Sequence, residues 1–163
     1  MASGTSLAEW TMNGVESLTS GAPAWTVVNN QPVLEFDAAA IETTLLSGVL
    51  SSAYAGGGVT VTLIWTSATA TSGDCMWASA IERQPVGHPI GTDDFAAGQT
   101  VTATAPGTAG TLVYTTIAFT HGAQMDSLAV GERFRMWVSR SATNGSDTMT
   151  GDARLVAVSL RET

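Results

Sequence analysis

The chain has no lysine, a single cysteine, and charged side chains at only 12% of its 163 positions. With Cys75 alone, an internal disulfide and a CxxC metal site are excluded, and we expect a structural thiol. No segment approaches the 18 apolar residues of a membrane span, and the first ten residues lack the features of a signal peptide. We therefore expect a protein that is made in a reducing cytoplasm and does not insert in a membrane.

The charge that is present is mostly negative. The chain has fourteen acidic residues and six basic ones, all of them arginine, which gives a formal net charge of −8. Binding to nucleic-acid phosphates or to an anionic membrane requires a basic surface, so we exclude both as partners. The acidic residues extend from Glu9 to Glu162 without a run, which indicates solubility rather than an acidic tail.

Motifs for catalysis and metal binding are also missing. There is no Gly-x-Ser-x-Gly elbow, no Walker loop and no dinucleotide fingerprint. His88 and His121, with Asp93 and Asp94, could ligate zinc or exchange protons, but no HxH, HxxxH or HExxH spacing supports this role. Aspartates in loops could bind calcium, but they lack the order of an EF-hand loop; they are Asp74, Asp93, Asp94, Asp147 and Asp152. We predict no enzymatic activity, no catalytic residue, no metal and no cofactor.

What the chain does contain is alternation of apolar and hydroxyl side chains. Between Val59 and Thr66 the period is two, which predicts a half-buried strand. The pattern recurs, and the expected strands are Leu7–Met12, Trp25–Val28, Val33–Asp37, Thr43–Leu50, Val59–Thr66, Cys75–Arg83, Thr100–Ala105, Leu112–Thr120, Arg133–Arg140 and Arg154–Arg161. Only Phe36 to Leu46, with three consecutive alanines, is a candidate helix.

Many short strands about ten residues apart indicate an all-β fold, an antiparallel β-sandwich of the jelly-roll type. An immunoglobulin-like sandwich is the alternative, but the chain has no Cys…Trp…Cys spacing. The regular pattern defines one β jelly-roll domain over residues 32–163. Residues 1–31 are less regular, so we expect an extended N-terminal arm there.

Two groups of residues are candidates for contact with partners. Trp10 and Trp25 lie in the expected arm, where they either pack on their own domain or anchor the arm to another protein. Arg133, Arg135 and Trp137 share one face of a strand. Their side chains either pair with acidic neighbours across the sheet or form an interface between subunits, where Arg and Trp are enriched.

Several segments resemble a family of small virion proteins of tailed bacteriophages. The longest is YAGGGVTVTLIW at 54–65, followed by ATATSGD at 68–74. Further matches are TATAPGTAG at 102–110, DSLAVGERFR at 126–135 and DTMTGDA at 147–153. The resemblance covers roughly residues 30–163, with the segments in the same order.

The resemblance implies a jelly roll that forms a homotrimer, has no enzymatic residues and acts as a capsid decoration (cement) protein. Such a protein binds the major capsid protein on the outer surface of the virion and stabilises the shell by bridging capsid subunits. In this interpretation Trp10 and Trp25 contact the capsid, and Arg133, Arg135 and Trp137 form the oligomer interface.

Two other functions remain open. One is a carbohydrate- or receptor-binding jelly-roll module of a phage fibre or tail, which exposed rings of Trp77 and Trp137 would favour. The other is a glycan-degrading enzyme, which needs two carboxylates that face one cleft.

Overall fold

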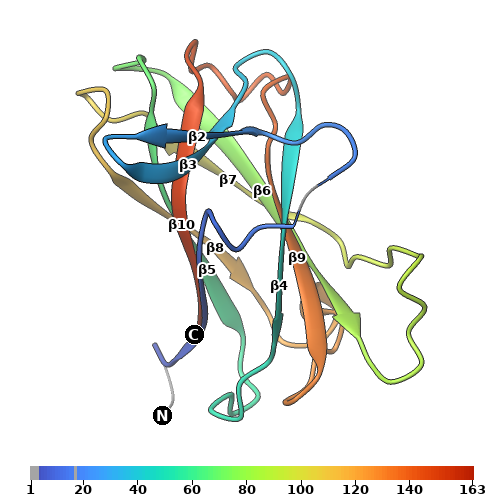
Figure 1. Cartoon of the computed structure of the whole chain (residues 1–163). Coiled ribbons are helices and arrows are strands. Elements are labelled where there is room, and N and C mark those ends of the chain that lie inside the picture. Colours follow the sequence, from blue (N-terminus) through green and yellow to red (C-terminus); the bar gives the residue numbers. More distant parts are fainter. Residues whose placement is uncertain (1–3, 17) are drawn as a thin grey trace.

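The computed structural model describes residues 4–16 and 18–163 and shows two antiparallel sheets packed face to face (Figure 1). The larger sheet contains, in spatial order, β2 (Ala24–Val28), β3 (Gln31–Phe36), β10 (Ala153–Glu162), β5 (Val59–Ser67) and β8 (Val113–Phe119), and β1 (Ser6–Thr11) also pairs with β10. The smaller sheet contains β4 (Glu42–Val49), β9 (Arg133–Arg140), β6 (Asp74–Gln84) and β7 (Gln99–Thr104). The predicted antiparallel β-sandwich of the jelly-roll type is confirmed.

Strand β10 organises the larger sheet. One of its edges pairs with β5 along its whole length. The other edge is shared, because β3 pairs with Ala153–Leu155 and β1 pairs with residues 157–161. Within the described residues the single helical element is the short 3-10 turn η1 (Ala123–Met125), and no helix there could cross a membrane.

The extended N-terminal arm was a wrong prediction, because β1 and β2 are both hydrogen-bonded strands of the larger sheet. Trp10 lies opposite Val158 of β10, and its side chain is 9% exposed. Its indole N–H donates to the Ser47 carbonyl oxygen at 2.9 Å, and its ring meets Phe134 edge-on. The irregular sequence that suggested an arm includes the connection before β2 and the short turn at Asn29 and Asn30 between β2 and β3.

The candidate helix between Phe36 and Leu46 was also wrong. The Asp37 carboxylate accepts the N–H groups of Ala39 and Ala40 at 2.5 and 3.1 Å, which forms a local turn instead of a first helical turn. Strand β4 then begins at Glu42. A short aspartate side chain therefore outweighs the helix propensity of three alanines.

Trp77 lies at the centre of an aromatic cluster in the core between the sheets. The Trp77 ring packs edge-on against Trp65, with centroids 5.6 Å apart, and against Phe36 at 5.1 Å. The Trp65 indole N–H donates to Thr115 Oγ1 at 2.8 Å. Cys75 is buried beside them on the inner face of β6, and burial raises the pKa of its thiol, as expected for a structural cysteine.

Candidate functional site

The outer face of the larger sheet carries polar side chains in a row across four strands. Thr62 of β5 lies opposite Ser159 of β10 on one side and Thr116 of β8 on the other. Ser159 in turn lies opposite Glu9 of β1. Because side chains alternate between the faces of a strand, these four residues share the solvent side of the sheet.

A second row lies beside the first and is mostly apolar. Ile64 of β5 lies opposite Tyr114 of β8 and Ala157 of β10. The Tyr114 side chain is 65% exposed, which is high for a large aromatic residue within a strand. On the other side of the polar row, Arg161 of β10 lies opposite Thr60 and is exposed.

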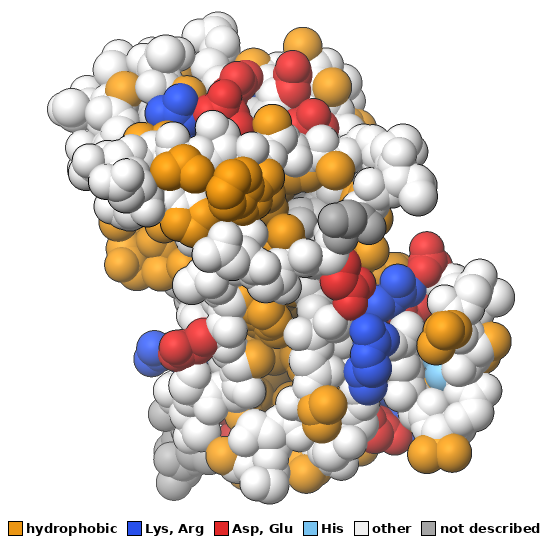
Figure 2. Space-filling view, in the orientation of Figure 1, with side chains coloured by type: hydrophobic (Ala, Val, Ile, Leu, Met, Phe, Trp, Pro, Cys, Tyr) orange, Lys and Arg blue, Asp and Glu red, His pale blue; other side chains and the backbone are white. Residues whose placement is uncertain are grey.

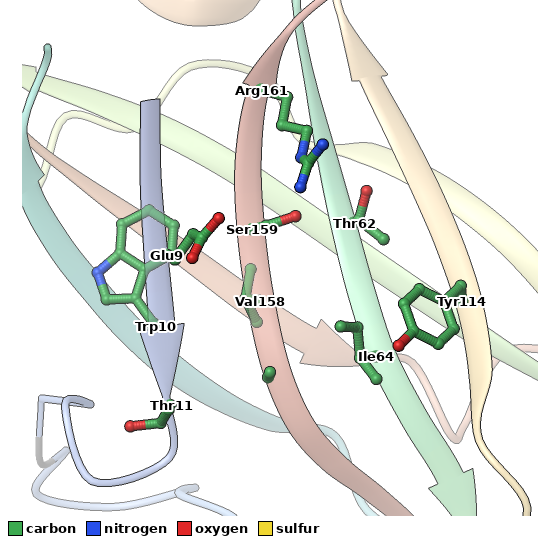
Figure 3. Close-up of a pocket in the computed structure, with 10 residues that line it drawn as sticks. Glu9, Trp10, Thr11, Thr62, Ile64, Tyr114, Val158, Ser159 and Arg161 are labelled. Atoms are coloured by element: carbon green, nitrogen blue, oxygen red, sulfur yellow. The ribbon is translucent and has the colours of Figure 1, made fainter. Parts of the chain in front are cut away.

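Apart from Thr116, the residues of these two rows line a groove together with Arg161, and the groove has a volume of about 740 Å³ (Figure 3). Its volume is within the range of small-molecule binding sites. The side chains that give the groove its chemistry are Glu9, Thr62, Ile64, Tyr114, Ser159 and Arg161. We call this feature the larger-sheet groove.

The larger-sheet groove contains one carboxylate and one guanidinium. Glu9 accepts a hydrogen bond from the Ser6 hydroxyl at 2.9 Å. Within residues 4–16 and 18–163, no carboxylate forms an ion pair with Arg161. Because Glu9 is the only acid among the lining residues that the structure describes, the pair of carboxylates that a glycosidase needs is not found in this groove.

The tryptophans singled out in the sequence lie elsewhere. Trp77 is fully buried in the core, and Trp137 is half-buried on the outer face of the smaller sheet. A Cβ atom on Gly98 would lie 3.0 Å from the Trp137 ring, so this chain segment covers the ring closely. Neither residue offers an open aromatic platform. Of the two predicted capsid contacts, Trp10 packs in the core, whereas Trp25 is 55% exposed on β2.

Arg133, Arg135 and Trp137 alternate on β9, and the two arginines pair with acidic neighbours. Arg135 Nε donates to Glu82 Oε2 at 2.7 Å, and the same guanidinium binds Asp93. The hydrogen bond to Glu82 is the main cause of a raised pKa of Arg135. Arg133 binds Glu16 at 3.2 Å. Of the two roles expected from the sequence, the structure shows the pairing of the arginines with acidic neighbours. The oligomer interface stays a prediction.

The candidate metal and acid–base residues have separate partners. His88 lies beside Glu82, with Nε2 3.8 Å from Oε1, whereas His121 Nδ1 lies 2.7 Å from the Tyr54 hydroxyl. The loop aspartates are used locally: Asp74 accepts from Thr104, Asp147 binds Arg140, and Asp152 accepts the Ala38 N–H. In the described part of the chain, no three His, Cys, Asp or Glu side chains form a group that could hold a metal ion.

Sequence reasoning missed Tyr114, Ile64 and Arg161 as members of one site. The available signal was the phase of the strand predicted at Leu112–Thr120, in which Tyr114 alternates with the inward-facing Thr115 and Ile117. An aromatic residue in the solvent phase of a strand is a candidate for ligand contact.

No protein-family model matches the chain, and no curated protein matches it in sequence. Among solved structures, it is similar to a CBM36 carbohydrate-binding module in complex with calcium and xylotriose, with a TM-score of 0.50, 13% identity, and coverage of 94% of this chain and 99% of the other. It is also similar to the CBM35 of Cellvibrio japonicus Abf62, with a TM-score of 0.50, 14% identity, and coverage of 94% and 92%. At this identity the similarity shows the fold.

Proposed function

We propose that this chain is a carbohydrate-binding module that holds an oligosaccharide in the larger-sheet groove. The observation that carries the proposal is the position of an open aromatic ring, Tyr114, beside a row of hydroxyl and charged side chains. The solved structures with the same fold and a TM-score of 0.50 are carbohydrate-binding modules by name, which makes a saccharide the first ligand class to test.

The chemistry of the groove complements that of a sugar. A pyranose ring has an apolar face of C–H groups, and the exposed Tyr114 ring with Ile64 beside it provides an apolar surface for that face. The rim of the sugar carries hydroxyl groups that donate and accept. Thr62, Ser159 and Glu9 present such partners in one row.

The groove also has the length and rigidity for an oligosaccharide. Strands are spaced at about 4.8 Å, so the four strands from β1 to β8 span about 15 Å, the length of a short oligosaccharide. All the side chains stand on paired strands and not on loops. Their positions are therefore fixed before binding, which reduces the entropy lost on association.

The test is calorimetric titration of the whole chain with a panel of xylo-, manno- and gluco-oligosaccharides. We expect binding to at least one of them, and a reduction of about tenfold or more in Tyr114→Ala. The matched control is Trp25→Ala, since Trp25 is also an exposed aromatic residue of the same sheet and lies outside the groove. Absence of binding across the panel, or equal losses in both variants, would contradict the proposal.

Capsid decoration is the second candidate, and strand β2 favours it. Trp25, Val27 and Val28 are all exposed on this edge strand, and Figure 2 shows hydrophobic side chains gathered over the β2–β3 hairpin. An exposed apolar patch on a small protein marks a surface for protein contact. In this proposal a homotrimer binds the major capsid protein through Trp25 and stabilises the shell of the virion.

The variants Trp25→Ala and Tyr114→Ala also test the capsid proposal, with the opposite expectation for each. Co-sedimentation with undecorated phage capsids should weaken in Trp25→Ala and be unchanged in Tyr114→Ala. Light scattering at micromolar concentration tests the trimer, and the mass of one subunit, 16.7 kDa, would contradict it.

A further inference from the structure

Arg161 differs from every other arginine of the chain in its surroundings. The other five arginines are in ion pairs with carboxylates, and the pairs are Arg83–Glu132, Arg133–Glu16, Arg135–Glu82, Arg140–Asp147 and Arg154–Glu35. Within the described residues, Arg161 has no such partner, although acidic residues outnumber arginines fourteen to six. The arginine left available for a ligand is therefore the one in the larger-sheet groove.

The direction of the Arg161 side chain places its charge over the groove. Figure 3 shows the guanidinium group extending over β10 and β5 towards Ser159 and Thr62. A guanidinium group presents its N–H donors in a planar fork, which matches the two oxygens of a carboxylate. The hydroxyl groups of Ser159 and Thr62 lie where they can bind the rest of a sugar unit held in this way.

We propose that the ligand of the larger-sheet groove is an acidic oligosaccharide, and that Arg161 binds the carboxylate of a uronic acid unit. This inference rests on the proposed carbohydrate-binding function and names its ligand class. The carboxylate accepts two hydrogen bonds from the Arg161 guanidinium, and a different sugar unit lies on the Tyr114 ring.

The register of the strands separates these two contacts. Thr60, opposite Arg161, and Ile64, opposite Tyr114, are four residues apart on β5, which is about 13 Å along the strand. Arg161 and Tyr114 also stand on the two strands that flank β5, about 10 Å apart. The ligand therefore crosses the sheet diagonally, with its carboxylate unit at the Arg161 end.

The overall charge of the protein makes this contact selective. A net charge of −8 repels an acidic glycan at long range, but at physiological salt such repulsion is screened beyond about 8 Å. A local cation is then needed to bind the carboxylate, and Arg161 is the one within the groove. Glu9, at the β1 side, disfavours a second carboxylate there.

The test compares one ligand in two chemical forms. The probe is a glucuronic acid-substituted xylo-oligosaccharide, and its partner is the same compound after reduction of the carboxyl groups to primary alcohols. Titration of the whole chain should show about tenfold tighter binding of the carboxylated form. This preference for the carboxylated form should decrease between 0.05 and 0.5 M salt. Over that range the Debye length becomes about threefold shorter, so the attraction between the exposed guanidinium and the carboxylate is screened more strongly.

Variants assign the preference to Arg161. In Arg161→Gln the ratio of the two affinities should fall to about one, and Arg161→Lys should keep only part of it because lysine lacks the planar fork. The control Arg133→Gln removes an exposed arginine of the smaller sheet and should retain the full ratio. Equal binding of the two forms by the unaltered protein, or binding of neither form, overturns this inference. The carbohydrate proposal is contradicted as well only if the neutral oligosaccharides of the panel also fail to bind.

Discussion

The strands of both sheets follow the same alternating pattern, but the side chains on the two outer faces differ in how deeply they are buried. On the smaller sheet, Ala78, Ala80 and Glu82 of β6 point outward yet are buried. The segment after β6 folds back along the strand, where the Asp94 N–H donates to Glu82 and the Ala96 N–H donates to the Ile81 carbonyl oxygen. Figure 2 shows arginine and acidic side chains side by side over β9, which flanks β6. On the larger sheet, the outward side chains of β8 are exposed, and those of β5 from Thr60 to Ile64 are half-buried.

This difference separates stability from binding. The ion pairs and the covering segment make the outer face of β6 a second buried layer, so we expect its residues to contribute to folding stability. The open face has no comparable contacts, and its aromatic and charged side chains are available to a ligand. All five paired arginines therefore lie outside the lining of the larger-sheet groove.

Removing Glu82 should have the largest effect. Its fully buried carboxylate accepts hydrogen bonds from Arg135 Nε at 2.7 Å, Gln84 Nε2 at 3.1 Å and the Asp94 N–H at 2.5 Å. Glu82→Ala leaves the buried Gln84 amide and Arg135 Nε without this acceptor, although Asp93 still pairs with the Arg135 guanidinium. We expect a loss of about 3 kcal/mol in the free energy of unfolding. Urea denaturation measures it.

The control for this prediction is Glu9→Ala on the open face. It removes an exposed carboxylate from the larger sheet and should change stability by less than about 0.5 kcal/mol. Similar losses in the two variants would show that the two faces do not differ as described.

Gly98→Ala should have the next largest effect. An added Cβ would lie 3.0 and 3.1 Å from two atoms of the Trp137 ring, which is too close for unstrained packing. We expect a loss of about 1–3 kcal/mol, measured as a lower thermal midpoint. Gly91→Ala, in the same connection but with open space around the new atom, is the control and should be neutral. A neutral Gly98→Ala would mean that the segment does not pack on Trp137.

The sequence predicted the strands and the fold class well, because each strand carries its own period-two pattern. It failed at Asp37 and at the N-terminus for a physical reason. A side-chain carboxylate that closes a turn at Ala39, and a β10 edge that accepts β1 beside β3, are interactions with specific partners and not properties of a local pattern.

The larger-sheet groove could not be predicted from the sequence for a related reason. Its residues come from four strands, and Glu9 and Arg161 lie at opposite ends of the chain. Each occupies an ordinary solvent-facing strand position, so only the pairing of β1, β10, β5 and β8 brings them together. The stripe of Arg133, Arg135 and Trp137 was visible because its members alternate on one strand.

The pH dependence of stability provides a third prediction, at the end of the smaller sheet. Arg83 donates two hydrogen bonds to Glu132, which lowers the pKa of that carboxyl below its ordinary value of 4.5. The folded state then binds fewer protons than the unfolded state, so this pair contributes fully above that value. Its contribution decreases as the pH falls through about 4.5 towards the lower pKa of the folded state.

Glu132→Gln should therefore show a smaller loss of stability than the unaltered protein between about pH 5 and pH 3. Arg83→Gln should have the same effect, and the double variant should add nothing more, because both changes remove one interaction. Urea midpoints measured between pH 5 and pH 3 test this prediction. If both single variants keep the pH dependence of the unaltered protein, the Arg83–Glu132 pair is not its cause.

Tyr114→Ala should have the smallest effect on stability, which is the strictest test of the comparison. The ring is 65% exposed, so its removal takes little apolar surface out of the packing of the sheet. We expect a change within about 0.5 kcal/mol, as for most surface substitutions. Its neighbour on β8, Thr115, faces the core and accepts the Trp65 indole N–H, so Thr115→Val should cost about 1–3 kcal/mol. If Tyr114→Ala instead destabilises the protein as much as Thr115→Val, the ring is part of the packing of the larger sheet, and its exposure no longer argues for a ligand.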